Sequence, residues 1–206
     1  MFRIFTRSPA RKLLLSAVAF LWLGAVAGGF AAAVRFEVTQ GAPASLPREW
    51  PAAAPIARDA GLPTLLVFVH PRCPCTTATV GELARLLAHC GDKVRTVVLC
   101  YSDPALGPDW AHTGTWSQAA AIPGVAVRED PLGAAARAFG AATSGQVCLY
   151  SRDGELRFEG GITPSRGHAG DNRGADALAA LLLGGTGPDT SAVFGCSLLG
   201  PAEGGR

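Results

Sequence analysis

Residues 65–90 read LLVFVHPRCPCTTATVGELARLLAHC, and this stretch decides the fold. Its first five residues are a short apolar run between Pro63 and Pro71, typical of a strand buried on both faces. From residue 76 onward the apolar side chains recur at helical spacing, and Gly91 is suited to end that helix. A second apolar run, RTVVLC, follows at residues 95–100. The order predicts a strand, a helix and a strand joined by a right-handed crossover, with the two strands parallel.

The rest of the chain predicts further helices and an antiparallel hairpin. Arg152-Asp153-Gly154 is a turn sequence between two short apolar runs, which indicates a hairpin. Asp130 is expected to cap a helix that has Pro131 in its first turn, where the missing N–H does no harm. The expected elements are a short helix at 116–121, a short strand at 125–127, a helix at 131–139 ended by Gly140, strands at 147–150 and 156–158, and a last helix at about 175–183. We therefore expect an α/β fold with a mixed central sheet flanked by helices.

Four segments are expected along the chain. Residues 1–34 form an N-terminal membrane anchor or signal segment, and residues 61–184 form the folded domain. Between them, residues 35–60 are rich in proline and alanine; prolines recur at every fourth position from 43 to 55, which forbids a regular helix and favours an extended tether. Residues 185–206 are a glycine-rich tail that carries Cys196.

The N-terminal segment indicates export. Residues 13–34 are apolar apart from Ser16, and a helix of this length reaches about 30 Å, the thickness of the hydrocarbon core of a bilayer. Arg3, Arg7, Arg11 and Lys12 precede it and should remain in the cytoplasm, which sends the following domain across the membrane. Residues 25–27 and 31–33 also fit a signal-cleavage pattern, but the apolar run is longer than that of a usual signal peptide. We favour an anchor over a cleaved signal, and both interpretations export the domain.

The charge of the chain argues against nucleic-acid binding. Four of the 18 basic residues precede the apolar segment, which leaves 14 bases against 16 acids in the rest of the chain. Such a domain has no excess of basic residues with which to neutralise phosphates. The six cysteines are too few for a fold built on disulfides at this length, so their positions carry the information.

Cys73 and Cys75 lie where the first strand passes into the helix. A thiol there faces unpaired backbone N–H groups and the positive end of the helix dipole, both of which favour the thiolate. Arg72 and His70 add positive charge or a protonatable group, so the pKa of a cysteine should fall below its ordinary value. Pro74 stiffens the link, and a disulfide across one residue closes a small, strained ring that is easily reduced. The pair therefore predicts thiol–disulfide exchange rather than a permanent cross-link.

Two other interpretations of the pair remain open. The cysteines can be structural, or they can bind a soft metal such as copper, because thiolates are preferred ligands of such ions. In the metal hypothesis a histidine, His70 or His168, would complete the site with Cys73 and Cys75. No cofactor is expected for the redox hypothesis.

The segment FVHPRCPCTTATVGEL resembles the active-site region of the thioredoxin superfamily, with Cys-Pro-Cys in place of Cys-x-x-Cys. EDPLGAAARAFGAATSGQVCLYSRDGEL resembles the acid, short helix and hairpin of exported thioredoxin-like proteins. Together with the run SRGHAGDN at 165–172, these segments are similar to bacterial membrane-anchored thioredoxin-like proteins known as RedB. The resemblance covers roughly residues 60–199. It implies a thioredoxin-like fold on the periplasmic side of the inner membrane, tethered by a single N-terminal span, but no substrate.

The chain departs from that family at one position. Thioredoxins place a cis-proline opposite the cysteines, whereas this chain has Thr143-Ser144-Gly145-Gln146 there. A cis bond without proline costs about 2.5–4 kcal/mol, so we do not expect that geometry. Gly145 still allows a partner backbone to approach closely, and we expect a narrower range of partners.

Cys196 lies in the tail, within VFGCSLLG. Either the tail folds back and Cys196 acts as a resolving or ligating thiol with the active pair, or its apolar neighbours only pin the tail to a groove. Cys90, Cys100 and Cys148 fall on apolar faces and are expected to be small buried side chains.

The function predicted from the sequence is that of a membrane-tethered thiol–disulfide oxidoreductase acting on an exported partner protein. Cys73 is expected to be the exposed attacking thiolate, because the first cysteine of such motifs usually is, and Cys75 the resolving thiol. The hypothesis requires that these sulfurs can reach solvent. A copper-binding or copper-delivery protein of the same fold is the main alternative, and a thiol peroxidase is a weaker third.

Overall fold

The structure is a computed structural model that describes residues 9–199. Arg3 and Arg7, whose charges entered the prediction of orientation, and the end of the tail at 200–206 lie outside the described residues. The chain divides into two compact units, Met1–Val38 and Thr39–Arg206.

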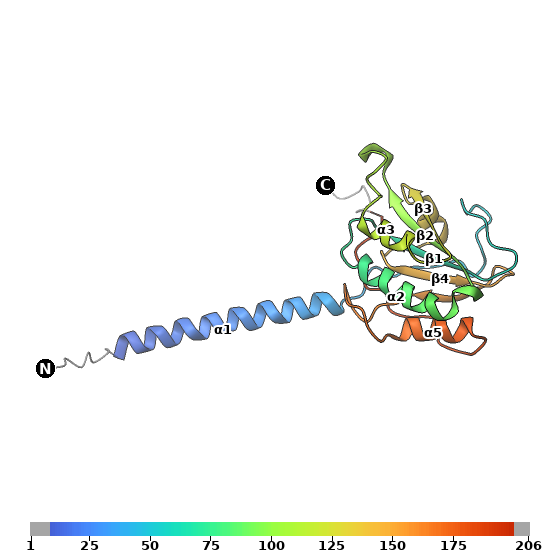
Figure 1. The fold of residues 1–206 in the computed structure, drawn as a ribbon. Helices are drawn as coiled ribbons and strands as arrows, with labels where there is room; N and C mark the ends of the chain where they lie inside the picture. Colours follow the sequence, from blue (N-terminus) through green and yellow to red (C-terminus); the bar gives the residue numbers. More distant parts are fainter. Residues whose placement is uncertain (1–8, 200–206) are drawn as a thin grey trace. The chain divides into compact units, whose positions relative to one another are not determined.

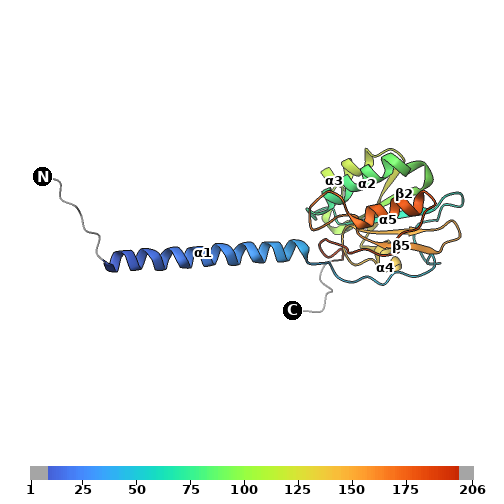
Figure 2. The ribbon, with the colours of Figure 1, turned by 90° about the horizontal axis from the view of Figure 1, so that it is seen from below.

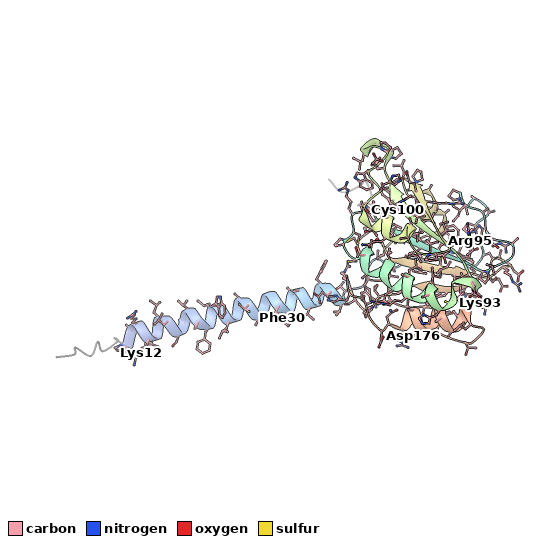
Figure 3. All side chains as sticks on the ribbon, in the orientation of Figure 1. Lys12, Phe30, Lys93, Arg95, Cys100 and Asp176 are labelled. Carbon is pink, nitrogen blue, oxygen red and sulfur yellow. The ribbon has the colours of Figure 1, made fainter. Side chains whose placement is uncertain are left out.

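The first unit contains one long helix, α1 (Pro9–Val38), which extends past the predicted boundary at Val34. None of its described side chains is buried; Lys12 and Phe30 both project from it (Figure 3). α1 is long and apolar enough to cross a membrane, a property that an N-terminal signal sequence shares. The expectation of a membrane anchor or signal helix is therefore confirmed at this level.

The second unit is built on a five-stranded mixed sheet with the order β3-β2-β1-β4-β5 (Figure 1). β1 pairs with β2 in parallel, as does β2 with β3, whereas β4 is antiparallel to both β1 and β5. The crossover and the hairpin predicted from the sequence are thus both present. The strands are β1 (Thr64–Val69), β2 (Arg95–Ser102), β3 (Val125–Pro131), β4 (Gln146–Tyr150) and β5 (Leu156–Gly160).

Helices cover both faces of the sheet. α2, α3 and α5 pack on one face, and α4 lies on the other (Figure 2). Two 3₁₀ turns flank β2. The helices are α2 (Thr76–Cys90), α3 (Gly114–Ala120), α4 (Ala134–Phe139) and α5 (Arg173–Leu182), and the turns are η1 (Gly91–Lys93) and η2 (Pro104–Leu106).

The alternation of side chains along β1 explains the two cores. Leu65 and Val67 point into the core beneath α2 and α5, while Leu66 and Phe68 point into the core beneath α4. All four are fully buried, so β1 is the central strand that both layers need. This burial fixes the end of β1, and with it the start of α2.

One predicted boundary was wrong. Pro131 is the last residue of β3 and not the first of a helix, because β3 pairs with β2 as far as Ser102. Leu132 and Gly133 then adopt left-handed backbone conformations, with φ of 52° and 69°, which separate the strand from α4. Asp130 is nevertheless a helix cap: its buried carboxylate accepts hydrogen bonds from the amides of Ala135 (2.7 Å) and Ala136 (3.0 Å).

The proline-rich segment after Thr39 contains no helix, as its prolines predict, and lies along the domain. The carbonyl of Pro47 accepts a hydrogen bond from the Tyr150 hydroxyl at 2.9 Å. The ring of Trp50 packs edge-on against Phe139 and Tyr150, with centroids 5.0 and 5.3 Å away. This segment therefore completes the core on the α4 face of the sheet.

Candidate functional site

The turn between β1 and α2 positions both cysteines of the Cys-Pro-Cys motif. The amide of Cys73 donates to the carbonyl of His70 at 3.1 Å, which closes the turn after the strand. Cys75 is the residue that caps α2, and its carbonyl accepts from the amides of Ala78 (3.2 Å) and Thr79 (3.4 Å). Both sulfurs thus belong to the N-terminal end of a 15-residue helix, where the backbone favours negative charge.

Cys196 lies at the same place. Its Sγ is 3.1 Å from the Sγ of Cys73, and the sulfurs of Cys73, Cys75 and Cys196 all lie within 4.8 Å of one another. All six cysteines are free thiols. The fold therefore brings Cys196 to the Cys73–Cys75 pair, although it lies 123 positions after Cys73 in the sequence.

The C-terminal segment reaches this position by pairing with the loop before β4. The amide of Ser144 donates to the carbonyl of Cys196, and the amide of Leu198 donates to the carbonyl of Ala142, both at 2.9 Å. Thr143 and Ser197 form an antiparallel bridge between these two bonds. We call residues 142–144 the ledge and residues 192–199 the tail strand.

The cysteines are less exposed than the sequence suggested. Cys73 was expected to be the exposed thiol, but its exposed fraction is 4%, and that of Cys75 is 7%. Cys196 is in contact with Cys73, and its neighbour Phe194 places a carbonyl above Gly145. The tail strand therefore accounts for the burial, and sequence patterns around Cys73 carry no sign of so distant a segment.

A small polar network ties the ledge to the cysteine turn. The hydroxyl of Ser144 accepts a hydrogen bond from the amide of His70 at 2.8 Å and lies 3.0 Å from the hydroxyl of Thr76. The Thr76 hydroxyl is also within hydrogen-bond distance of the His70 carbonyl, at 3.2 Å. Ser144 and Thr76 are each 1% exposed, so this network holds the turn in a fixed position relative to the ledge.

The three thiols differ in acidity. Burial works to raise the pKa of Cys73, but hydrogen bonds from the Cys196 thiol and amide, the Cys75 amide and the Thr76 hydroxyl outweigh it, so this pKa is lowered. The pKa of Cys75 is raised by burial and by the neighbouring charge of Cys73. The pKa of Cys196 is raised to about 12 by burial and by its hydrogen bond to Cys73. Cys73 is therefore the most acidic thiol of the three.

His70 and His168 do not join the sulfurs. The ring of His70 stacks on Tyr101 at 5.4 Å, and its Nδ1 accepts a hydrogen bond from the amide of Arg72 at 3.2 Å. Burial, followed by the charge of Arg72, lowers the pKa of His70, which favours its neutral form. His168 is exposed, and its Nδ1 lies 2.8 Å from the carbonyl of Arg166. Among residues 9–199, the metal-ligating side chains that gather at this site are the three cysteines.

Gly145 has a different role from the one expected. Its φ of +93° is a conformation that glycine tolerates, and its amide donates to the carbonyl of Phe68 at 2.7 Å. A side chain there would meet the Thr79 hydroxyl at 2.9 Å. The described residues contain no cis peptide bond, in line with the lost proline. The space beside Gly145, where a partner backbone was expected, is occupied by the Phe194 carbonyl of the tail strand.

Arg166 is a site residue that sequence reasoning missed. Its guanidinium donates to the carbonyls of Gly195 and of Thr39 (3.1 Å for the latter), which holds the tail strand in place. Its positive charge also opposes the rise in the pKa of Cys75 and of Cys196. The only signal in the sequence was its place in the run at 165–172.

The remaining cysteines are buried, as predicted. Cys90, Cys100 and Cys148 have exposed fractions of 2% or less. Burial raises the pKa of each, to about 12 for Cys100 and well above the ordinary value for Cys148. Cys100 lies on β2 within the domain (Figure 3). They are packing residues.

No model of a known protein family matches the chain, and no curated protein sequence matches it closely. The chain is similar to the structure of a hypothetical protein from Sinorhizobium meliloti, at 24% identity over 80% of this chain and 99% of that one, with a TM-score of 0.60. An uncharacterized conserved protein from Geobacillus kaustophilus shares 20% identity over 80% of this chain and 94% of that one, with a TM-score of 0.57. A secreted disulfide oxidoreductase from Mycobacterium tuberculosis, homologous to Escherichia coli DsbE, shares 18% identity over 60% of this chain and 82% of that one, with a TM-score of 0.44. These similarities concern the fold alone, and the mixed sheet with its flanking helices is thioredoxin-like.

Proposed function

We propose that this chain is a membrane-tethered thiol–disulfide oxidoreductase that exchanges disulfides with an exported partner protein through Cys73 and Cys75. The observation that carries the proposal is the lowered pKa of Cys73 at the N-terminal end of α2, beside a second thiol whose pKa is raised. Disulfide exchange needs one thiolate to attack and one thiol held in reserve. This pair meets both requirements.

The exchange proceeds in two displacements. The Cys73 thiolate attacks one sulfur of a partner disulfide; a Cys73–partner bond forms, the partner disulfide breaks, and the released sulfur takes a proton. Cys75 then loses its proton to solvent and attacks the Sγ of Cys73. The Cys73–Cys75 disulfide forms and the second partner thiol leaves, so two electrons pass from the chain to the partner. The reverse sequence oxidises a partner dithiol.

Export and tethering are part of the proposal. α1 is apolar throughout its centre, with Arg11 and Lys12 near its start, and this pattern favours a single span with the following domain on the periplasmic side. Disulfide exchange with client proteins suits that oxidising compartment. The three sequence segments quoted above resemble the membrane-anchored RedB group, and we include this resemblance as support for the proposed tether.

Trapping of partners tests the redox function. The full chain with both Cys75→Ser and Cys196→Ser should accumulate mixed disulfides with exported proteins, because neither thiol beside Cys73 is left to displace the partner. Cys73→Ser should accumulate none, and Cys90→Ser serves as the matched control because Cys90 is buried away from the site. Non-reducing gels and mass spectrometry measure the complexes. Equal trapping by the Cys75→Ser/Cys196→Ser double variant and by Cys73→Ser would refute the assignment of Cys73.

The three clustered thiols favour a second candidate function, the binding of Cu(I). Thiolates are preferred ligands of this soft ion. Three sulfurs around an ion at a metal–sulfur distance of about 2.3 Å would lie about 4 Å apart. The three sulfurs lie within 4.8 Å of one another, and the 3.1 Å between those of Cys73 and Cys196 would widen by about 1 Å on binding. Cys73, Cys75 and Cys196 would hold the ion, and His70 and His168 would not.

Anaerobic titration of the reduced full chain with Cu(I) tests this candidate. Cys196→Ser should weaken binding at least tenfold if three sulfurs bind the ion, whereas His168→Ala should leave the affinity unchanged. Equal affinity of wild type and Cys196→Ser would exclude the three-sulfur site. Loss of binding in His168→Ala would instead support a metal site formed by the cysteines and His168.

A further inference from the structure

The tail strand occupies the active site as a bound peptide would. Its backbone pairs in antiparallel fashion with the ledge, through Cys196 on Ser144 and Leu198 on Ala142. This pairing delivers the Sγ of Cys196 to 3.1 Å from the attacking sulfur of Cys73. A partner disulfide would have to reach the same sulfur, so the partner and the tail strand compete for one place.

The residues beside Cys196 fit this place closely. A side chain on Gly195 would collide with the carbonyl of Ser144, so only glycine is accommodated directly before the cysteine. Two residues after it, Leu198 is 1% exposed and packs in the core with Phe139 and Phe68. Cys196 thus follows a position that accepts only glycine, Gly195, and lies two positions before a buried apolar side chain, Leu198.

We propose that Cys196 is a third redox thiol and that the tail strand is an internal substrate, which a partner displaces. The inference rests on the proposed redox function and deepens it. It also defines the partner: an extended segment whose cysteine follows a small residue and precedes an apolar side chain by two positions.

The internal exchange is balanced without a further reagent. When a partner disulfide has oxidised the pair to a Cys73–Cys75 disulfide, Cys196 loses its proton and attacks the Sγ of Cys73. A Cys73–Cys196 bond forms, the Cys73–Cys75 bond breaks, and Cys75 leaves as a thiolate that takes up the proton. No electrons are gained or lost. The small ring expected of a Cys-x-Cys disulfide is exchanged for a long loop, which relieves its strain.

The first test maps disulfides in the full chain, in detergent, after oxidation with glutathione disulfide. In Cys75→Ser, Cys73 should take up glutathione and Cys196 should displace it, leaving a Cys73–Cys196 bond. In the double variant with Cys196→Ser, glutathione should remain on Cys73. If Cys73 in Cys75→Ser keeps its glutathione while Cys196 stays free, the inference is overturned and the redox function stands. If Cys73 takes up no glutathione in either variant, the redox function itself fails.

The second test measures how fast Cys73 in the reduced full chain reacts with an alkylating reagent, with each rate divided by the thiolate fraction of that variant, because loss of the Cys196 donor also changes the acidity of Cys73. Gly195→Ala should unseat the tail strand and speed the reaction about tenfold or more, which corresponds to a loss of about 1.4 kcal/mol in its docking. Gly114→Ala is the matched control, because a side chain there meets no atom within 4 Å. Leu198→Ala should also speed the reaction, whereas Leu178→Ala, equally buried in the other core, should not. Equal rates in wild type, Gly195→Ala and Leu198→Ala would show that the tail strand does not cover the site.

Discussion

The amide of Ser144 donates a hydrogen bond to the carbonyl of Cys196 across 2.9 Å, and this bond joins the loop before β4 to the end of the chain. It lies beside the contact between Cys196 and Cys73, so the acidity of the Cys73 thiol depends on a residue 123 positions away. Several expectations about reactivity and stability follow from this arrangement.

Removal of the Cys196 thiol should raise the pKa of Cys73. Cys196→Ala loses the S–H donor that stabilises the Cys73 thiolate, whereas Cys196→Ser keeps a donor at that position. A hydrogen bond to a charged group contributes about 1.5–3 kcal/mol, so the thiolate population near neutral pH should fall by about tenfold in Cys196→Ala. The ultraviolet absorbance of the thiolate, followed against pH, measures the change. An unchanged titration in Cys196→Ala would contradict the role of this hydrogen bond.

Loss of the Ser144 hydroxyl should destabilise the fold. In Ser144→Ala the amide of His70 loses its partner, and the hydroxyl of Thr76 keeps only the His70 carbonyl, at a cost of about 1–3 kcal/mol. The melting temperature should fall by several degrees. Ser151→Ala is the matched control, because the Ser151 hydroxyl accepts from the amide of Glu155 in an exposed turn. Similar melting temperatures for the two variants would show that the network contributes little.

Stability should decline at alkaline pH. The folded-state pKa of Cys100 is raised to about 12 from an ordinary value near 9, so its contribution is fully present below pH 9 and is lost as pH rises toward 12. The folded state then binds more protons than the unfolded state, and the free energy of unfolding falls by up to about 1.4 kcal/mol per pH unit for this thiol. Urea unfolding at a series of pH values measures the slope. Cys100→Val, which cannot titrate, should show a shallower decline; an identical slope would exclude Cys100 as the cause.

The N-terminal helix should remain on the mature protein. α1 is 30 residues long, and its apolar run exceeds that of usual signal peptides. We expect the protein to resist alkaline carbonate extraction from membranes and its intact mass to include residues 1–38. A mature chain that begins just after Ala27 or Ala33 would establish cleavage instead.

The sequence predicted the central part of the fold because its signals are local. The apolar run that became β1, the helical spacing after Thr76 and the turn at Gly154 each depend on a few neighbouring residues. The boundary at Pro131 was wrong because β3 is extended by pairing with β2, a long-range effect that outweighs the preference of proline for the first turn of a helix.

The site was only half predictable for the same reason. Cys73 and Cys75 could be placed from the strand and helix that flank them. The sequence left open whether the tail folds back to bring Cys196 to this pair, and the structure places its sulfur 3.1 Å from that of Cys73. The position of Arg166 on Gly195 and the burial of the pair follow from this fold-back and were not predicted. No pattern among neighbouring residues predicts where the tail strand docks.

The depth at which Cys90, Cys100 and Cys148 are buried has a consequence for how the chain matures. An unfolded chain meeting the oxidants outside the cytoplasm would offer six equivalent thiols, from which 15 complete pairings can be drawn. Closure of the sheet and α2 buries three of them, and buried thiols are out of reach of oxidants. Oxidation that comes after collapse therefore finds a single cluster of sulfurs, so the order of folding and oxidation decides whether the thiols pair natively or are scrambled.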